Sequence, residues 1–296
     1  MHILMTGGTG LIGTAACAAL HTAGHRLTIL TRRARPATTE ATYITSLGEC
    51  AERVDVVINL AGAGLADRRW SSAYKRQIVS SRVDLTRELV VWMSQLEQVP
   101  NRLMSASAVG DDGAAAERTF TEGAGVGTGF SSGLCQSWEE EAGRAAAHGT
   151  QVSLLRFGVV LARDGGALGK MTQSFRLGVE TWLGSGEQWL SWIHVDDAVR
   201  VIQHVLALEC PAGAYNTVAP EPARHREFAH EAGRQSKIWL KLGVPAIAAR
   251  LMAGEMAEEL LLSGQRVLPS QLLEDGFQFH YPTLNEALKN LIPGKG

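Results

Sequence analysis

Three glycines near the N-terminus have the spacing of a dinucleotide-binding loop. Gly7, Gly10 and Gly13 stand between a short apolar segment, residues 2–5, and an alanine-rich segment, residues 11–23. A strand, a tight turn and a helix in this order let the backbone approach a pyrophosphate and direct free N–H groups at it. An ordinary glycine turn is the alternative, and the flanking strand and helix argue against it. The residues of this loop predicted to bind the cofactor are Gly7, Thr9, Gly10, Leu11, Ile12 and Gly13.

The residues after the second expected strand, 27–30, indicate which dinucleotide binds. An NAD site places Asp or Glu there, about 20 positions after the last glycine, to bond the ribose 2′-hydroxyl. This chain has Thr31, Arg32 and Arg33 instead. A guanidinium matches a 2′-phosphate through paired hydrogen bonds. NADP(H) is therefore the expected cofactor, preferred over NAD. The alternative is that Arg32 and Arg33 only form a basic turn exposed to solvent.

Two further segments extend the predicted cofactor site. Leu60, Ala61 and Gly62 follow the apolar run 54–60, and small residues there leave room for the backbone to pass the adenosine. Arg82 begins the next expected helix, 81–96, and is within reach of a phosphate or of the nicotinamide end. A surface arginine fits the same spacing.

These residues need a scaffold that brings strand ends together. Strands are expected at 2–5, 27–30, 54–60, 102–107, 152–160 and 214–218, and helices at 11–23, 81–96, 137–147 and 195–208, the last with Asp196 or Asp197 as N-cap. Strands alternating with helices predict an α/β fold, a Rossmann-type doubly wound parallel sheet with a smaller, mostly helical substrate lobe. We assign residues 1–160 and about 193–212 to the NADP-binding domain. Residues 161–192 and 213–296 form the substrate lobe.

Composition excludes several other classes of protein. The 296 residues are 45% hydrophobic with a net charge of −2, which gives no bulk attraction to nucleic acid or to an anionic membrane. No apolar stretch is long enough to span a bilayer, and the first strand begins too early for a secretory leader. The four cysteines are widely spaced without a metal-ligand pattern. We expect a cytoplasmic protein with reduced thiols and no metal.

Longer motifs resemble the extended short-chain dehydrogenase/reductase superfamily. These are TGGTGLIG from Thr6, INLAG from Ile58, SASAVG from Ser105 and RFGVVLARDGGAL from Arg156. ADRRW (66–70), GSGEQ (184–188), WIHVDD (192–197) and QRVLP (265–269) resemble its epimerase-family branch, NAD(P)-dependent epimerase/dehydratase-like proteins with a small C-terminal domain of unknown function. The resemblance covers nearly the whole chain. It implies that Arg82 touches the cofactor, as do Val159 and Val160 near the nicotinamide.

The same resemblance exposes a missing catalytic pair. Hydride chemistry in that superfamily uses a Ser or Thr to hold the substrate oxygen, a Tyr to transfer the proton, and a Lys four residues later to lower the pKa of that Tyr. Ser107 fits the serine role, and Ser105 is the second choice and a predicted cofactor contact. No tyrosine here is followed by lysine at the fourth position, and the expected segment has Phe130, Leu134 and Cys135.

A second departure follows the strand expected at 102–107. Relatives tend to have Tyr-Tyr-Gly there, where this chain reads Asp111-Asp112-Gly113. Asp111 would be an acid or base if buried, but Gly-Asp-Asp-Gly is a strong turn sequence, which is the favoured interpretation.

Three functions remain open from the sequence. The first is an NADP(H)-dependent oxidoreductase or isomerase with altered proton transfer, acting on an unidentified small or sugar-like substrate. The second is a non-catalytic NADP(H)-binding or redox-sensing module. The third is a nucleotide-sugar epimerase. Superfamily relatives often pair through helices beside the sheet, which leaves a homodimer open.

Overall fold

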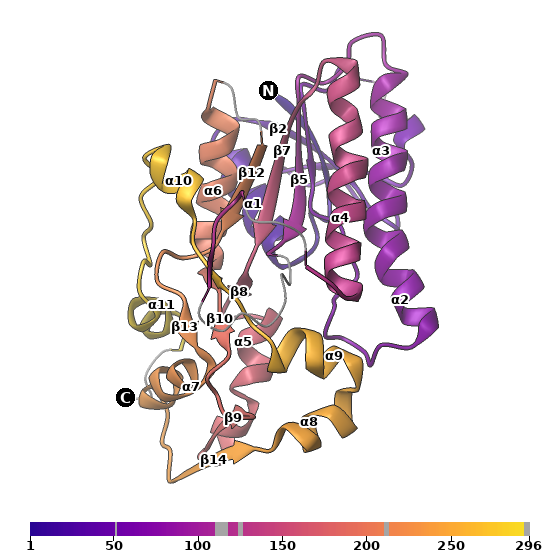
Figure 1. The fold of residues 1–296 in the computed structure, drawn as a ribbon. Coiled ribbons are helices and arrows are strands. Elements are labelled where there is room, and N and C mark those ends of the chain that lie inside the picture. The colour runs from indigo at the N-terminus through magenta and orange to yellow at the C-terminus, as the bar shows by residue number, and fades with distance from the viewer. Residues whose placement is uncertain (51, 110–117, 124–126, 210–212, 293–296) are drawn as a thin grey trace.

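A seven-stranded parallel sheet forms the centre of the molecule (Figure 1). The computed structural model describes residues 1–50, 52–109, 118–123, 127–209 and 213–292. In spatial order the strands are β12 (Gly213–Thr217), β7 (Gln151–Phe157), β5 (Arg102–Ala108), β4 (Val56–Asn59), β1 (His2–Thr6), β2 (Arg26–Leu30) and β3 (Thr42–Ile44). The order reverses beside β1, so the expected doubly wound Rossmann-type sheet is confirmed.

Helices cover both faces of this sheet. One layer contains α1 (Leu11–Thr22) and α6 (Val195–Ala207), which contact each other. The opposite layer contains α2 (Ser72–Val79), a π-helical turn (Ser80–Asp84), α3 (Leu85–Ser94) and α4 (Phe130–Gly143). Figure 1 shows α3 and α4 side by side on their face of the sheet.

The side chains of β1 point alternately to the two faces of the sheet, which explains why helices cover both faces. Ile3 and Met5 pack into the cluster that includes α6, whereas Leu4 packs with Leu89 of α3 and Ala142 of α4. Successive side chains of a strand point to opposite faces, so a strand that is apolar at every position needs a partner on both sides.

Most of the remaining elements form a smaller lobe beyond the carboxyl ends of the strands (Figure 1). They are β6 (Thr119–Phe120), β8 (Val159–Leu161), α5 (Gly166–Met171), β9 (Val179–Leu183), β10 (Trp189–Leu190), β11 (Trp192–His194), β13 (Ala223–Arg224), α7 (His225–Arg234), β14 (Leu240–Val244), α8 (Ala246–Ala253), α9 (Glu255–Ala257), β15 (Arg266–Val267) and α11 (Leu284–Leu291). The helix α10 (Ser270–Glu274) instead packs beside β12 at the edge of the central sheet (Figure 1). None of the described helices combines the length and apolar composition that crossing a bilayer requires.

Several boundaries differ from the sequence-based expectation. The strand expected at 152–160 is divided at Gly158 into β7 and β8, because β8 leaves the central sheet and pairs with β11. The strand expected at 214–218 is β12, which pairs with β7 at the edge of the central sheet. Residues 213–217 therefore belong to the Rossmann sheet, although we had assigned them to the substrate lobe. The strand β3 was not predicted.

The start of α6 differs in its cap. The N-cap is His194, whose Nδ1 accepts a hydrogen bond from the Asp196 amide at 3.0 Å, so neither Asp196 nor Asp197 caps the helix as predicted. The Asp197 carboxylate instead accepts from the amides of His280 and Tyr281, at 2.9 and 2.8 Å. It thereby holds the C-terminal chain against α6.

The imidazole of His194 is buried and stays neutral. Its ring stacks on Tyr281 with centroids 3.8 Å apart, and Nε2 lies 3.2 Å from Asn290 Oδ1. Since Nδ1 accepts from an amide, Nε2 carries the proton and donates it to Asn290. Burial lowers the pKa of His194 below its ordinary value.

This burial predicts an acid-sensitive fold. The unfolded chain takes up a proton at His194 near pH 6.5, before the folded chain does, so the unfolding free energy falls as pH drops below about 6.5. His194→Asn keeps an N-cap acceptor but loses the titration. We expect urea denaturation between about pH 7.5 and 5 to show a shallower decline for this variant. A slope equal to that of wild type, or of the exposed control His148→Asn, would contradict the assignment.

Candidate active site

The glycine loop packs against the end of the neighbouring strand. Gly7 has a φ of 70°, and a Cβ added there would lie 2.5 Å from the carbonyl of Leu60 and 2.7 Å from the amide of Ala61. A Cβ at Gly13 would overlap the Gly7 carbonyl oxygen. Only glycine fits these two positions, so the predicted tight turn and close helix packing are confirmed.

The start of α1 presents free donors beside this loop. Gly10 is the N-cap, and no side chain bonds the first amides of the helix. Thr9 and Gly10 are exposed, while Leu11 and Ile12 are half-buried. An uncapped helix start carries unsatisfied N–H groups and a partial positive charge, which suits a phosphate. This loop therefore fits the pyrophosphate of a dinucleotide.

The residues after β2 form an exposed basic turn next to the loop. The Thr31 hydroxyl donates to the carbonyl of Arg33 at 2.8 Å, which holds the turn. Arg32 and Arg33 are exposed, and no ion pair to either is formed by residues that the structure describes. Since β2 is the immediate neighbour of β1, these guanidinium groups lie on one side of the phosphate loop.

Arg82 lies on the other side of the loop, beyond β4. It stands in the π-helical turn, a rare geometry often found at functional sites. Its Nη1 donates to the Ala63 carbonyl at 2.9 Å, and its guanidinium carbon is 5.3 Å from the Trp138 ring centre. A Cβ on Gly62 would lie 2.7 Å from that carbon, so the guanidinium rests against the chain that leaves β4.

The charge of Arg82 lacks a counter-charge. Burial lowers the pKa of this guanidinium, and among the described residues no carboxylate pairs with it. A partly buried cation normally pairs with an anion or a ring of acceptors. Arg82 is therefore suited to bind an anionic ligand, and its predicted contact with the cofactor stays a prediction.

The two serines of β5 have different partners. Ser105 is fully buried and accepts a hydrogen bond from Asn59 Nδ2 at 3.2 Å, so its hydroxyl is bonded within the protein interior. Ser107 donates to Glu139 Oε1 of α4 at 2.7 Å. Arg156 of β7, which lies opposite Ser107 in the sheet register, binds both oxygens of Glu139. Ser107 is thus the better supported of the two candidates.

One of the half-buried valines of β8 lies near the cofactor loop. A Cβ on Gly166 would lie 2.8 Å from the Leu11 side chain and 3.5 Å from the Val160 carbonyl. The segment that leaves β8 therefore lies over the start of α1. Val160 packs against the cluster that contains residues of α1, whereas Val159 packs against the cluster of the smaller lobe, so only Val160 lies near the loop, and the nicotinamide contact of both valines stays a prediction.

The first turn of α4 occupies the place of the missing catalytic pair. Phe130 and Ser131 begin the helix, and Cys135 lies one turn later. Burial raises the pKa of the Cys135 thiol, so it stays protonated and neutral beside Ser107. The expected helix began at residue 137, because the preceding Ser- and Gly-containing segment is a poor helix former.

A carboxylate from the C-terminal part of the chain supplies the missing cap of α4. Glu259, in the π-helical turn Glu258–Leu262, accepts from the amides of Phe130 and Ser131 at 3.0 and 2.8 Å. Gly129, the N-cap, contributes no side-chain bond. Sequence analysis missed both Glu259 and Glu139, because neither stands in a local motif and both act through contacts distant in the chain.

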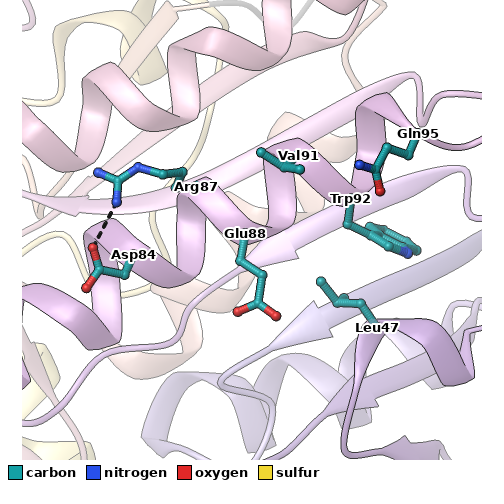
Figure 2. A pocket seen from close by; sticks show the side chains of 7 residues that line it. All are labelled: Leu47, Asp84, Arg87, Glu88, Val91, Trp92 and Gln95. Atoms are coloured by element: carbon teal, nitrogen blue, oxygen red, sulfur yellow. Dashed lines mark hydrogen bonds and ion pairs between the residues drawn. The ribbon is translucent and has the colours of Figure 1, made fainter.

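Two other regions do not add to this site. A pocket of about 430 Å³ lies between α3 and the turn Leu47–Glu49. None of the seven lining residues, labelled in Figure 2, is a candidate site residue. Asp111, Asp112 and Gly113 lie outside the described residues. Within the described ranges, no group of three or more His, Cys, Asp or Glu residues is arranged to hold a metal ion.

Comparison with known proteins agrees with this geometry. The model of the NAD-dependent epimerase/dehydratase family matches residues 3–217. The chain belongs to the NAD-dependent epimerase/dehydratase family. A domain of unknown function, DUF1731, matches residues 244–291, so Glu259 lies in that domain. The predicted family is thus confirmed.

Individual relatives of this family cover nearly the whole chain. An epimerase family protein of Mycobacterium bovis is 39% identical over 97% of this chain and 96% of its own. The crystal structure of the human epimerase family protein SDR39U1 with NADPH has a TM-score of 0.88 at 30% identity, covering 99% of each chain. A nucleoside-diphosphate sugar epimerase from Corynebacterium glutamicum has a TM-score of 0.79 at 26% identity, covering all of this chain and 59% of that one.

The Glu259 cap predicts a measurable contribution to stability. Glu259→Ala leaves the first amides of α4 without their acceptor, and we expect the unfolding free energy to fall by about 1–2 kcal/mol in urea denaturation. Glu258→Ala is the matched control, because that neighbouring carboxylate pairs with the half-exposed Arg250 and should matter less. Equal losses for the two variants would refute the capping role.

Proposed function

We propose that this protein binds NADP(H) in preference to NAD(H) and transfers hydride between the cofactor and a hydroxyl-bearing or carbonyl carbon of a small or sugar-like molecule. The observation that carries this proposal is the pair of basic positions flanking the phosphate loop, Arg32 after β2 and Arg82 beyond β4. Neither has a carboxylate partner among the described residues. The human relative whose solved structure contains NADPH supports the same choice of cofactor.

Each group of this chain would have a definite task with the cofactor bound. The loop Gly7–Gly13 and the α1 start would hold the pyrophosphate, and Arg32 with Arg33 would bind the 2′-phosphate. Leu60, Ala61 and Gly62 would pass beside the adenosine, and Arg82 would hold the half that carries the nicotinamide. The bound cofactor would supply or accept the hydride, and Ser107 would hold the reacting oxygen.

The three free cysteines that the structure describes, Cys17, Cys50 and Cys135, fit a reducing compartment. We therefore propose the cytoplasm as the place of action.

The two arginines predict opposite responses to a cofactor fragment. Adenosine 2′,5′-bisphosphate contains the 2′-phosphate but lacks the nicotinamide riboside. We expect Arg32→Ala to weaken both NADPH and this fragment about tenfold or more, since a lost charge-assisted hydrogen bond costs about 1.5–3 kcal/mol. NADH binding should not change. Fluorescence and calorimetric titrations measure these affinities, and an unchanged NADPH affinity in Arg32→Ala would refute the NADP preference.

Arg82→Ala should weaken NADPH about tenfold or more and leave adenosine 2′,5′-bisphosphate unaffected, because its guanidinium lies on the opposite side of the phosphate loop from Arg32. Arg76→Ala, at an exposed position of α2, is the control and should bind both ligands normally. Equal weakening of NADPH and the fragment would place Arg82 at the adenosine half instead.

Turnover distinguishes the proposal from a cofactor-binding module. Wild-type protein with NADP+ or NADPH is tested against secondary alcohols, carbonyl compounds and nucleotide sugars, with NADPH absorbance as the readout. Tight NADPH binding without oxidation or reduction of any compound would favour the non-catalytic module. Interconversion of nucleotide sugars without net NADPH change would favour an epimerase.

A further inference from the structure

The Ser107 hydroxyl already donates its hydrogen to a carboxylate of the protein. Ser107 is 3% exposed, and its Oγ donates to Glu139 Oε1 at 2.7 Å. An ionised carboxylate only accepts hydrogen bonds, so the hydrogen of this pair comes from the serine. A hydroxyl has one hydrogen and two lone pairs. The protonated Cys135 thiol also hydrogen-bonds this side chain, so Ser107 presents one remaining lone pair, and no hydrogen, toward a ligand.

Arg156 holds Glu139 in this role. Its Nε lies 2.8 Å from Oε1, and its second terminal nitrogen lies 2.7 Å from Oε2. This two-point pair fixes the plane of the carboxylate. The side chains of Glu139 and Arg156 are only 17% and 23% exposed. Arg156 also donates to the Glu122 carbonyl at 3.0 Å, which anchors the guanidinium.

The sheet register makes this arrangement rigid. Ser107 and Arg156 are Cα partners on adjacent strands, so their side chains leave the same face of the sheet. Glu139 reaches them from α4, which packs on that face. Among the residues that the structure describes, the other groups that face the pair are the neutral thiol of Cys135 on α4 and, behind that thiol, the cation of Arg82. Neither of these two groups is a base.

We propose that Ser107 and Glu139 form a proton-accepting pair that replaces the absent Tyr–Lys pair, with Arg156 as its positioning residue. The inference rests on the proposed function and specifies its substrate as a hydroxyl compound, a secondary alcohol of a sugar-like molecule. The substrate hydroxyl gives its proton to Ser107 Oγ while Ser107 gives its own proton to Glu139. The carbinol C–H bond breaks, and its hydride passes to NADP+, the oxidant of the proposed function. A carbonyl compound, NADPH and protonated Glu139 result.

The arrangement also sets a direction. A lone-pair acceptor next to a charged carboxylate stabilises a substrate O–H, whereas a carbonyl oxygen needs a donor. The resting site is therefore built for alcohol oxidation. Carbonyl reduction requires a proton on Glu139 first, so the reverse reaction gains speed in acid and the forward reaction loses it.

Glu139→Gln tests the proposal, because glutamine keeps the size and hydrogen-bonding shape of the side chain but accepts no proton. We expect kcat for alcohol oxidation to fall by about 10²- to 10⁴-fold, with NADPH affinity within twofold of wild type. The acid-side decline of the wild-type rate should disappear. The control is Glu140→Gln, an exposed neighbour that bonds only Gln136 among the described contacts and should retain the wild-type rate and pH profile.

The serine supplies an independent test if Glu139→Gln does not fold. Ser107→Ala removes the relay, whereas Ser107→Thr keeps a hydroxyl at the same position, so we expect Thr to recover most of the rate that Ala loses. Full activity in Glu139→Gln, an unchanged pH profile, or a Thr variant as inactive as Ala would each overturn the pair. These outcomes leave the proposed function standing. A wild-type protein that reduces carbonyl compounds but oxidises no alcohol would overturn the pair alone, and one that binds NADPH but does neither would overturn both.

Discussion

A buried group of polar side chains fixes the strand ends on which the site depends. The Thr6 hydroxyl donates to Asn59 at 2.7 Å and accepts from the Ala61 amide at 3.2 Å. Asn59 in turn donates to Thr86 of α3 and to Ser105 of β5. One asparagine thereby ties β1, β4, β5 and α3 together under the cofactor loop. Buried polar groups that are fully hydrogen-bonded define a single arrangement, because any shift leaves a donor or acceptor unsatisfied.

The two kinds of charge in the site are arranged differently. Around Ser107 the charges of Glu139 and Arg156 compensate each other, which keeps an ionised carboxylate near the sheet interior at tolerable cost. Around the phosphate loop, Arg32 and Arg82 have no such compensation within the described chain. In the proposed mechanism, the paired charges would set the proton chemistry and the uncompensated arginines would bind the anionic cofactor. Arginine therefore stands in two settings here. Arg156 pairs with a carboxylate, whereas Arg32 and Arg82 have none among the described residues.

Features encoded in short stretches of sequence were predicted well. The glycine loop, the basic turn after β2 and most strands of the sheet depend on local periodicity and turn chemistry, which a single sequence contains. Features that depend on distant contacts were not predicted. The early start of α4 depends on Glu259, the cap of α6 is a buried histidine rather than a nearby aspartate, and the partner of Ser107 lies 32 positions along the chain. β12 joined the sheet because of its pairing with β7, which its own sequence does not reveal.

The cap on α4 has a consequence for how the protein is made. The donors at residues 130 and 131 and their acceptor at 259 are separated by 129 and 128 positions. A chain emerging from the ribosome can assemble β1, β4 and the cofactor loop early, since domains form from the N-terminus as they are synthesised. The first turn of α4, near Ser107, receives its cap only after the C-terminal domain has been synthesised. An unfinished chain can therefore fold its glycine loop before the segment beside Ser107 is stabilised.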